Sequence, residues 1–404
     1  MKMKLSESIK LLHREAETIL INRLSGDWVR VSDEVLDIFR YASDNDLDLS
    51  QLLECVQSED KDFIKDTAIK FSEMGIFASA IKQDRQLGSI SYSTTHRCNL
   101  RCTHCIVDAE TCSSKDYFST REIEEILGKI IMANPQSIVI TGGEPLTRND
   151  FIETMSFCRN SYSGHLSLMT NGTLIDDELA RFITSHFDSC NISLDGYDEK
   201  TCAQIRGSGV FDRAIQGITL LQSYGMDNIS TSMILSGNNT NYIDEYIGLN
   251  HKLGTKPMLR GLTFSGRAKK NEAMLKTGAV GKNPRSQKSY EAIVKACTCT
   301  AGFDQCVIEA NGDIFPCNLF VAPRFKLGNI CEIQNLKDLL IETCETDLIS
   351  NCLMEYEPSK YEKCLDCDVS YFCWSCLYQI LELSEDDFND RCKAQKKYLE
   401  KVWE

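Results

Sequence analysis

An alternation of strand-like and helix-like segments between residues 88 and 290 constrains the fold of this 404-residue chain more than any other feature. Short runs of apolar and β-branched residues end at polar turns, and each run is followed by apolar residues at helical spacing. Six such units are present, with strands expected at about 90–93, 137–141, 165–170, 189–194, 229–235 and 258–264. Repeated units of this kind form a parallel sheet with helices outside it. The sequence therefore predicts an α/β fold whose chemistry lies at the carboxyl ends of the strands.

Three closely spaced cysteines follow the first expected strand. Cys98, Cys102 and Cys105 form a C-x3-C-x2-C pattern, with His104 before the last cysteine. A cubane 4Fe-4S cluster has four irons that each need a ligand, so three thiolates would leave one iron open to a small molecule. The alternatives are three unrelated thiols or a zinc site that uses a nearby histidine. Structural zinc sites have four closed ligands, so the pattern favours a cluster with one open iron.

Polar motifs also follow the next three expected strands. They are Thr141-Gly142-Gly143-Glu144-Pro145, Thr170-Asn171-Gly172 and Ser193-Leu194-Asp195-Gly196. Adjacent glycines let a backbone approach a ligand closely, and free carbonyls there can accept hydrogen bonds from an ammonium group. Each motif alone is commonly only a turn. At the ends of parallel strands, however, all three would lie at the same edge of the sheet as the cysteine loop.

The cysteine loop and the Gly-Gly-Glu-Pro turn one strand later resemble the radical S-adenosylmethionine (SAM) enzymes. The resemblance implies a partial (β/α)6 TIM-like barrel in which Cys98, Cys102 and Cys105 hold a catalytic cluster and SAM chelates its open iron. In that family an electron from the cluster cleaves SAM to methionine and a 5′-deoxyadenosyl radical, which takes a hydrogen atom from the substrate. The implied SAM-binding residues are His104, Gly142, Gly143, Glu144 and Pro145, with Ser193 and Asp195 near the ribose and Arg206 at the carboxylate. The alternative for the last three is a turn residue or a surface salt bridge.

From about residue 291 the composition shifts to cysteine, of which the chain has 20. In a reducing compartment this number favours metal or cluster ligation over disulfides. From spacing alone, the quartet that begins Cys364-x2-Cys367 and continues Cys373-x2-Cys376 could form a zinc ribbon. A zinc ribbon leaves the other cysteines of this region without a role.

The complete pattern resembles the SPASM extension of radical SAM enzymes, which carries two auxiliary 4Fe-4S clusters. The resemblance assigns the first auxiliary cluster to Cys299, Cys306, Cys317 and Cys376, and the second to Cys364, Cys367, Cys373 and Cys392. The last gap of the quartet has two residues where the family usually has three, so the Cys376 assignment stays open, and Cys297 could replace a ligand. An incompletely ligated cluster could bind a substrate thiolate directly. The remaining cysteines lie mostly in apolar stretches and are expected to be buried thiols.

Residues 1–85 contain no cluster motif and predict a winged-helix-like domain. Segments 18–22 and 28–31 predict a hairpin, and helices are expected after Ser32, at 49–56 and at 60–74. Winged helices often bind DNA, but the net charge of −15 argues against nucleic acid. In front of a radical SAM motif, the domain resembles the recognition element of enzymes that modify ribosomally made peptides, in which a leader peptide adds a strand to the hairpin edge. The alternative is a structural cap.

The resemblance thus implies three domains: a recognition domain at 1–85, a radical SAM core at 88–290 and a SPASM domain at 291–404. We expect an oxidoreductase that modifies a precursor peptide, with thioether formation from a substrate cysteine sulfur to carbon, as in sactipeptide and ranthipeptide maturases. The expected electron donor is external, such as flavodoxin or ferredoxin. Sulfatase-type maturation is disfavoured because Asn318 stands where that subfamily has an aspartate base. Carbon–carbon crosslinking and peptide decarboxylation stay open.

Other classes of function are less consistent with the sequence. A metal-binding redox regulator or an electron carrier would have no use for the Gly-Gly-Glu-Pro motif. Apolar runs are too short to span a membrane and the first residues lack the apolar core of a signal peptide, so we expect a cytoplasmic protein. A basic stretch at residues 266–288 predicts either a solvated loop or a segment over the substrate.

Overall fold

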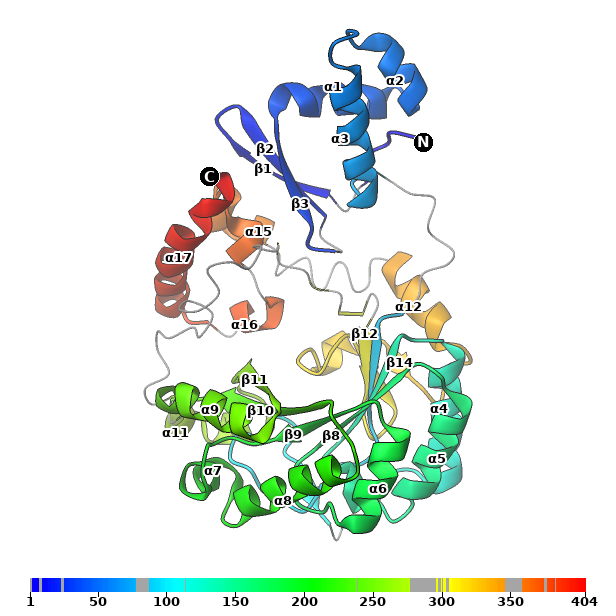
Figure 1. Cartoon of the computed structure of the whole chain (residues 1–404), viewed down its shortest axis with the longest axis vertical. Helices are drawn as coiled ribbons and strands as arrows, with labels where there is room; N and C mark the ends of the chain where they lie inside the picture. The colour runs from blue at the N-terminus through cyan, green and yellow to red at the C-terminus, as the bar shows by residue number, and fades with distance from the viewer. Residues whose placement is uncertain are drawn as a thin grey trace. The chain divides into compact units, whose positions relative to one another are not determined.

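A computed structural model describes residues 2–6, 9–22, 25–77, 87–112, 114–237, 239–276, 296, 299, 301–302, 305–345, 358–373, 376–381 and 383–404. The chain divides into two compact units (Figure 1). Unit 1 combines Met1–Arg85, Arg285–Thr300 and Asn351–Glu404, and unit 2 combines Gln86–Pro284 and Ala301–Ser350. The region expected to be the SPASM domain is therefore shared between the units. Cys297 and residues 277–288 of the basic stretch lie outside the described residues.

Unit 2 contains a nine-stranded sheet, within the described residues, in the order β11-β10-β9-β8-β7-β4-β12-β13-β14. Six of its strands are parallel neighbours: β4 (Ser89–Ser93), β7 (Ser137–Thr141), β8 (His165–Thr170), β9 (Ser189–Ser193), β10 (Ile229–Leu235) and β11 (Lys256–Gly261). This confirms the predicted α/β partial barrel. Only the last strand is displaced from its predicted position: β11 begins two residues before the expected start and ends at Gly261.

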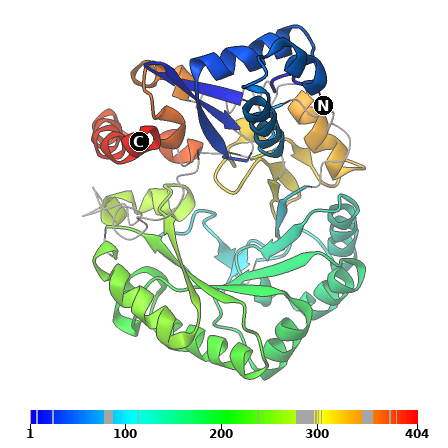
Figure 2. The ribbon, with the colours of Figure 1, turned by 45° about the horizontal axis from the view of Figure 1, so that its top comes forward.

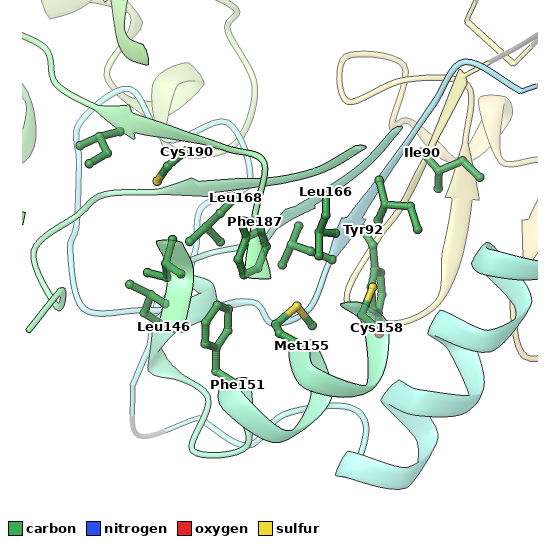
Figure 3. Packing of buried hydrophobic residues seen from close by; sticks show 14 of the residues in the cluster. Ile90, Tyr92, Leu146, Phe151, Met155, Cys158, Leu166, Leu168, Phe187 and Cys190 are labelled. Carbon is green, nitrogen blue, oxygen red and sulfur yellow. The ribbon is translucent and has the colours of Figure 1, made fainter. Parts of the chain in front are cut away.

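Helices cover the outer side of this sheet, whose strands form an open arc (Figure 2). They are α4 (Thr120–Met132), α5 (Phe151–Ser161), α6 (Asp177–His186), α7 (Glu199–Arg206), α8 (Val210–Ser223) and α9 (Ile243–Leu253). Phe151, Met155 and Cys158 on one face of α5 point toward Leu166 and Leu168 of β8 (Figure 3). Each large apolar side chain buried in this way contributes about 1.5–3 kcal/mol to folding. The buried layer fixes the strand ends on which the polar motifs lie.

Three short strands extend the sheet beyond β4. β12 (Gln305–Ile308) pairs in parallel with β4, and β13 (Asp313–Phe315) and β14 (Gly328–Asn329) follow as antiparallel neighbours. The smaller elements of unit 2 are β5 (Arg97–Cys98), β6 (Glu110–Thr111), η1 (Pro145–Thr147), η2 (Thr240–Tyr242), α10 (Gly266–Lys270), α11 (Glu272–Lys276), η4 (Pro323–Phe325) and α12 (Leu336–Glu345). The first part of the cysteine-rich region is thus continuous with the barrel sheet.

In its described residues, the N-terminal part of unit 1 is a three-stranded antiparallel sheet with three helices. The strands, in the order β1-β2-β3, are β1 (Ile9–Arg14), β2 (Glu17–Asn22) and β3 (Trp28–Ser32), and the helices are α1 (Asp33–Asp44), α2 (Leu49–Cys55) and α3 (Lys61–Glu73). The predicted hairpin and helices are confirmed, and β1 is an additional strand. Phe39, Phe71 and Phe77 pack their rings at the centre of this small core.

The C-terminal part of unit 1 packs against the β1–β2 hairpin. It consists of η5 (Pro358–Lys360), α14 (Glu362–Leu365), α15 (Ser370–Cys373), α16 (Leu377–Leu381), α17 (Glu385–Leu399) and η6 (Glu400–Trp403). Leu12 and Ile19 of the hairpin belong to one buried cluster with Phe372 and Trp403, and the Trp28 and Phe372 rings are 5.3 Å apart. The N-terminal domain and the last cysteines of the chain therefore share a core. None of the described helices is both long and apolar enough to cross a membrane.

Candidate active site

The three-cysteine loop leaves the end of β4 and lies against the Gly-Gly-Glu-Pro turn. The N–H groups of Gly143 and Glu144 donate to the carbonyls of Thr95 and Arg97, both at 2.7 Å. A Cβ atom at Gly143 would overlap the Arg97 carbonyl, and one at Gly142, where φ is +151°, would lie 2.6 Å from Thr95 O. The glycine pair is therefore required by the close approach of two backbone segments of this chain.

Glu144 is buried at the same edge, with 1% of its surface exposed. Its carboxylate accepts hydrogen bonds from Thr170 Oγ1 and Asn171 N, both at 2.7 Å, and from Leu146 N at 3.2 Å. Burial raises the pKa of Glu144 above its usual value, although these hydrogen bonds oppose the shift. A carboxylate fixed in this way fits a cationic group of a ligand, such as an ammonium.

Asp195 is the centre of a second buried polar group, and its exposed fraction is 0%. His104 Nε2 and Arg206 Nε each lie 2.6 Å from Oδ2, although the Arg206 Nε–H is not aligned with that oxygen. Ile234 N donates to Oδ1 at 2.6 Å. Burial alone would raise the pKa of Asp195, but the charges of Arg206 and His104 outweigh it and hold the pKa well below its usual range. Asp195 is therefore ionised and fully engaged by protein groups.

Each sulfur of the cysteine loop has a hydrogen-bond donor. Leu100 N donates to Cys98 Sγ and Ala109 N to Cys105 Sγ, both at 3.4 Å, while Arg206 Nη1 lies 3.8 Å from Cys102 Sγ. Burial raises the pKa of Cys98 to about 12 and raises the pKa of Cys102 as well.

Buried thiols of this kind become thiolates when iron coordinates them, and soft sulfur ligands suit an iron–sulfur cluster. Among the residues that the structure describes, no three His, Cys, Asp or Glu side chains close around a single metal ion.

Asparagines connect the cysteine loop to the end of β8. Asn99 Nδ2 donates to Thr173 Oγ1, and Asn171 Nδ2 donates to Asn99 Oδ1, both at 2.8 Å. The sequence pattern identified Asn171 as part of a turn and did not identify Asn99. A polar side chain inside the cysteine motif was the available signal, but its partner is more than seventy residues away.

Asp116 is a further residue that the sequence reasoning missed. Its carboxylate accepts a hydrogen bond from Thr95 Oγ1 at 2.5 Å and forms ion pairs with Arg97 at 2.8 Å and Arg148 at 3.4 Å. These contacts hold the start of the cysteine loop against the turn after β7. No motif surrounds Asp116 in the sequence, so nothing distinguished it from a surface aspartate.

Four cysteines of unit 1 line one cavity: Cys364, Cys367, Cys373 and Cys392. They come from α14, the turn after it, α15 and α17. Arg391 and Lys396 line the same cavity, and Arg391 Nη2 donates to Cys373 O at 2.6 Å. Burial raises the pKa of Cys373, opposed by the charge of Arg391. Four thiols with two cations beside them suit an anionic, fully thiolate-ligated cluster.

The other four cysteines assigned to an auxiliary cluster are divided between the units. Cys306 on β12 and Cys317 after β13 belong to unit 2, whereas Cys299 and Cys376 belong to unit 1. Cys306 is buried, and burial raises its pKa to about 12.

Ser193 ends β9 and Pro145 begins η1, both at the edge of the sheet that carries the loop.

Cysteines outside these groups only partly match the expectation of buried thiols. Cys158, Cys190 and Cys202 are buried, as predicted. Cys55, Cys112 and Cys331 are exposed, so the prediction is wrong for them. Apolar neighbours indicated that these segments pack against a core, but they did not show which face of the segment each cysteine occupies.

The fold and the three-thiol loop define a radical SAM protein, and comparison with known proteins agrees. Residues 92–249 match the family model of the radical SAM superfamily. Residues 297–368 match the SPASM model, described as an iron–sulfur cluster-binding domain. The chain therefore combines a radical SAM domain with a SPASM domain, and the resemblance inferred from its sequence is confirmed. Its cofactors are SAM and 4Fe-4S clusters, one in the radical SAM domain and auxiliary ones in the SPASM domain.

Relatives are similar to much of the chain. "Mycofactocin maturase MftC" of Mycolicibacterium smegmatis is 26% identical over 263 residues, which cover 60% of this chain and 67% of that protein. "GTP 3′,8-cyclase" of Synechocystis is 30% identical over 142 residues, or 35% of this chain and 43% of that protein. The structure of Streptococcus suis SuiB bound to SAM matches with a TM-score of 0.57 at 16% identity, covering 95% of this chain and 98% of that one. The structure of anSMEcpe with bound SAM gives 0.51 at 19% identity, covering 78% and 100%.

Proposed function

We propose that this protein is a radical SAM enzyme that modifies a ribosomally made peptide. One observation carries the proposal: a single chain combines the three-thiol loop with an N-terminal domain in which edge strand β3 pairs, within the described residues, only with β2. A strand at the edge of a sheet can add an extended peptide as a further strand. Two similarities support the same class, since one relative is named a maturase and one matched structure is SuiB bound to precursor peptide SuiA.

In this proposal Cys98, Cys102 and Cys105 hold the cluster on which SAM binds. SAM bound there supplies the hydrogen-atom abstraction that starts the reaction. Glu144 fits the SAM ammonium because its carboxylate is buried and oriented by three donors. Arg206 lies beside Cys102 and keeps its positive charge, since Asp195 raises its pKa despite burial, so it remains the candidate for the SAM carboxylate. The further SAM-binding candidates are His104, Gly142, Gly143, Pro145, Ser193 and Asp195.

The finer proposal is a thioether bond between a substrate cysteine and a carbon atom of the peptide. Each such bond removes one hydrogen from carbon and one from sulfur, which is a net oxidation of the peptide. Auxiliary clusters are suitable electron acceptors for that oxidation. The place of Cys376 in the quartet departs from the family spacing, and a first auxiliary cluster that lacks this ligand could bind a substrate thiolate directly. A reducing cytoplasmic location and an external flavodoxin or ferredoxin donor are part of this proposal.

The test is anaerobic coexpression with a short cysteine-containing peptide encoded beside this gene, followed by mass spectrometry. We expect the peptide to lose a pair of hydrogens per bond and its cysteines to resist alkylation. Cys98→Ala should abolish both effects, whereas Cys55→Ala, which removes an exposed thiol on α2, should not. An unmodified peptide from a protein that still cleaves SAM would refute the peptide substrate. A mass change with alkylatable cysteines would refute the thioether alone.

A further inference from the structure

Residues 266–271 lie on the cysteine loop, although the sequence predicted a solvated or substrate-covering segment. Five hydrogen bonds connect the two. Arg267 N and Ala268 N donate to Cys105 O at 2.8 and 3.2 Å, and Asn271 Nδ2 donates to Thr103 O at 2.9 Å. Arg267 Nη1 and Nη2 donate to the carbonyls of Cys102 and Ala109 at 3.2 and 2.9 Å. The segment thus donates to four carbonyls of the loop around the last two cysteines.

The segment is held rigidly enough to act as a support. Gly266 has a φ of +52°, and a side chain there would overlap the Ile106 carbonyl, so only glycine allows this approach. Ala268 and Leu275 are fully buried in a small apolar cluster with Ile205 of α7. Both α10 and α11 are therefore anchored to the barrel.

Asp108 connects this support to a sulfur atom. Its φ is +48°, a left-handed conformation that non-glycine residues seldom adopt. Arg267 Nη2 and Lys270 Nζ hold its carboxylate at 2.9 and 2.5 Å. The next residue is Ala109, whose N–H donates to Cys105 Sγ and whose carbonyl accepts from Arg267. The peptide that donates to Cys105 is thus fixed on both sides by Arg267.

We propose that Arg267, with Asp108 and Lys270, is a positioning group that sets the N–H···S hydrogen bond on Cys105 and so raises the reduction potential of the SAM-binding cluster. Hydrogen bonds to cluster sulfurs and nearby positive charge stabilise the more negative, reduced state of a cluster. The donor to Cys98 belongs to the loop itself, whereas the donor to Cys105 depends on a residue 158 positions away from Ala109. The inference requires Cys105 to be a cluster ligand and is independent of the peptide substrate.

The test is an anaerobic redox titration of the full-length protein. It is monitored by the part of the EPR signal that changes when SAM is added. That part reports the SAM-binding cluster apart from the auxiliary clusters. We expect Arg267→Gln to shift the midpoint to a more negative potential while iron content stays unchanged. Arg267→Lys keeps the charge but cannot bond both carbonyls, so it should also shift the midpoint. A wild-type midpoint in both variants would overturn the proposal.

A milder pair of variants decides the question if Arg267→Gln loses its cluster. Lys270→Gln removes the second partner of Asp108, and Lys269→Gln makes the same charge change on the same helix, where Lys269 pairs with Glu272 instead. The two lysine side chains are similarly exposed, at 70% and 61%. We expect a negative shift in Lys270→Gln and none in Lys269→Gln. Equal shifts would mean a general charge effect, and no shift in either would mean a structural support only; both results would overturn the proposal.

Discussion

At the scale of single residues, the charge of Asp195 connects parts of the site that the sequence presented separately. Its buried carboxylate lies 2.6 Å from His104 inside the cysteine loop and 2.6 Å from Arg206 at the end of α7. Arg206 in turn lies 3.8 Å from Cys102 Sγ. The guanidinium of Arg206 therefore lies between the charge of Asp195 and the candidate cluster ligand Cys102.

We expect Asp195→Asn to lower the free energy of unfolding by about 3–5 kcal/mol, because it leaves the buried Arg206 without its counter-ion. The variant should also weaken SAM binding by more than about tenfold, which equals about 1.4 kcal/mol. Anaerobic denaturant unfolding and SAM titration measure the two effects. Asp212→Asn, on the exposed face of α8, is the control and should stay within about 0.5 kcal/mol of wild type. Equal stability of the two variants would mean that the buried pair contributes nothing.

Two glycine-to-alanine substitutions should change the stability of the protein in opposite directions. Gly143→Ala should destabilise the protein by about 1–3 kcal/mol and reduce cluster incorporation, since its Cβ would overlap the Arg97 carbonyl. Gly128→Ala in helix α4 meets no atom within 4 Å and should stabilise by about 1 kcal/mol. Unfolding midpoints and iron content per chain distinguish them. A neutral Gly143→Ala would show that the turn can move away from the loop.

Residue types and strand ends were predictable here, whereas most contacts were not. The three cysteines, Glu144 and Asp195 follow strands whose apolar runs mark them, so their common edge could be predicted. The partner of Asp195 in the loop, His104, is 91 residues away in the sequence. No local sequence pattern predicts a contact at that separation. The contacts of Arg267 could not be predicted either, because a basic run usually indicates a solvated surface.

At the scale of elements, strand β1 and edge strand β3 define what the N-terminal domain offers a partner. β1 was missed because Ile9, Leu11 and Leu12 do not alternate strictly, and the turn into β2 uses Glu15 at φ +57° instead of a glycine or asparagine signal. With β1 in place, β2 is the central strand and β3 is an edge among the strands that the structure describes. The hairpin expected from the sequence thus supplies two of the three described strands of this sheet.

If a leader peptide adds to this sheet at β3, the backbone amides of Trp28–Ser32 should exchange hydrogen more slowly when the leader is present. Amides of β1 at the opposite edge should exchange at an unchanged rate and serve as an internal control. Hydrogen–deuterium exchange with the synthetic leader, followed by mass spectrometry, measures both strands. Protection at β1 instead, or at neither strand, would favour the structural cap over a recognition domain.

At the scale of the whole molecule, unit 1 joins the two ends of the sequence around one core. Leu12, Ile19 and Ile21 of the hairpin pack with Phe372 and Trp403, and Cys367 and Cys373 pack against the same cluster. Arg14 also pairs with Asp368 at 3.9 Å, between two of the cavity cysteines. The candidate recognition domain and the segment that forms the four-cysteine cavity therefore share one hydrophobic core. Sequence patterns could indicate each part, but not this packing, because it joins segments more than 300 residues apart.

Because the core is shared, we expect a substitution in the N-terminal sheet to weaken the four-cysteine site. Trp28→Ala removes a partly buried ring 5.3 Å from Phe372 and should destabilise unit 1 by about 2 kcal/mol, less than the full cost of a buried tryptophan. Iron bound at Cys364, Cys367, Cys373 and Cys392 should then be lost faster to a chelator, while the SAM-dependent EPR signal of the other unit persists. Tyr41→Ala, which removes an aromatic ring that is 55% exposed on α1, is the matched control and should retain its iron. Iron loss equal in the two variants, or loss of the SAM-dependent signal first, would show that the N-terminal sheet does not support the four-cysteine site.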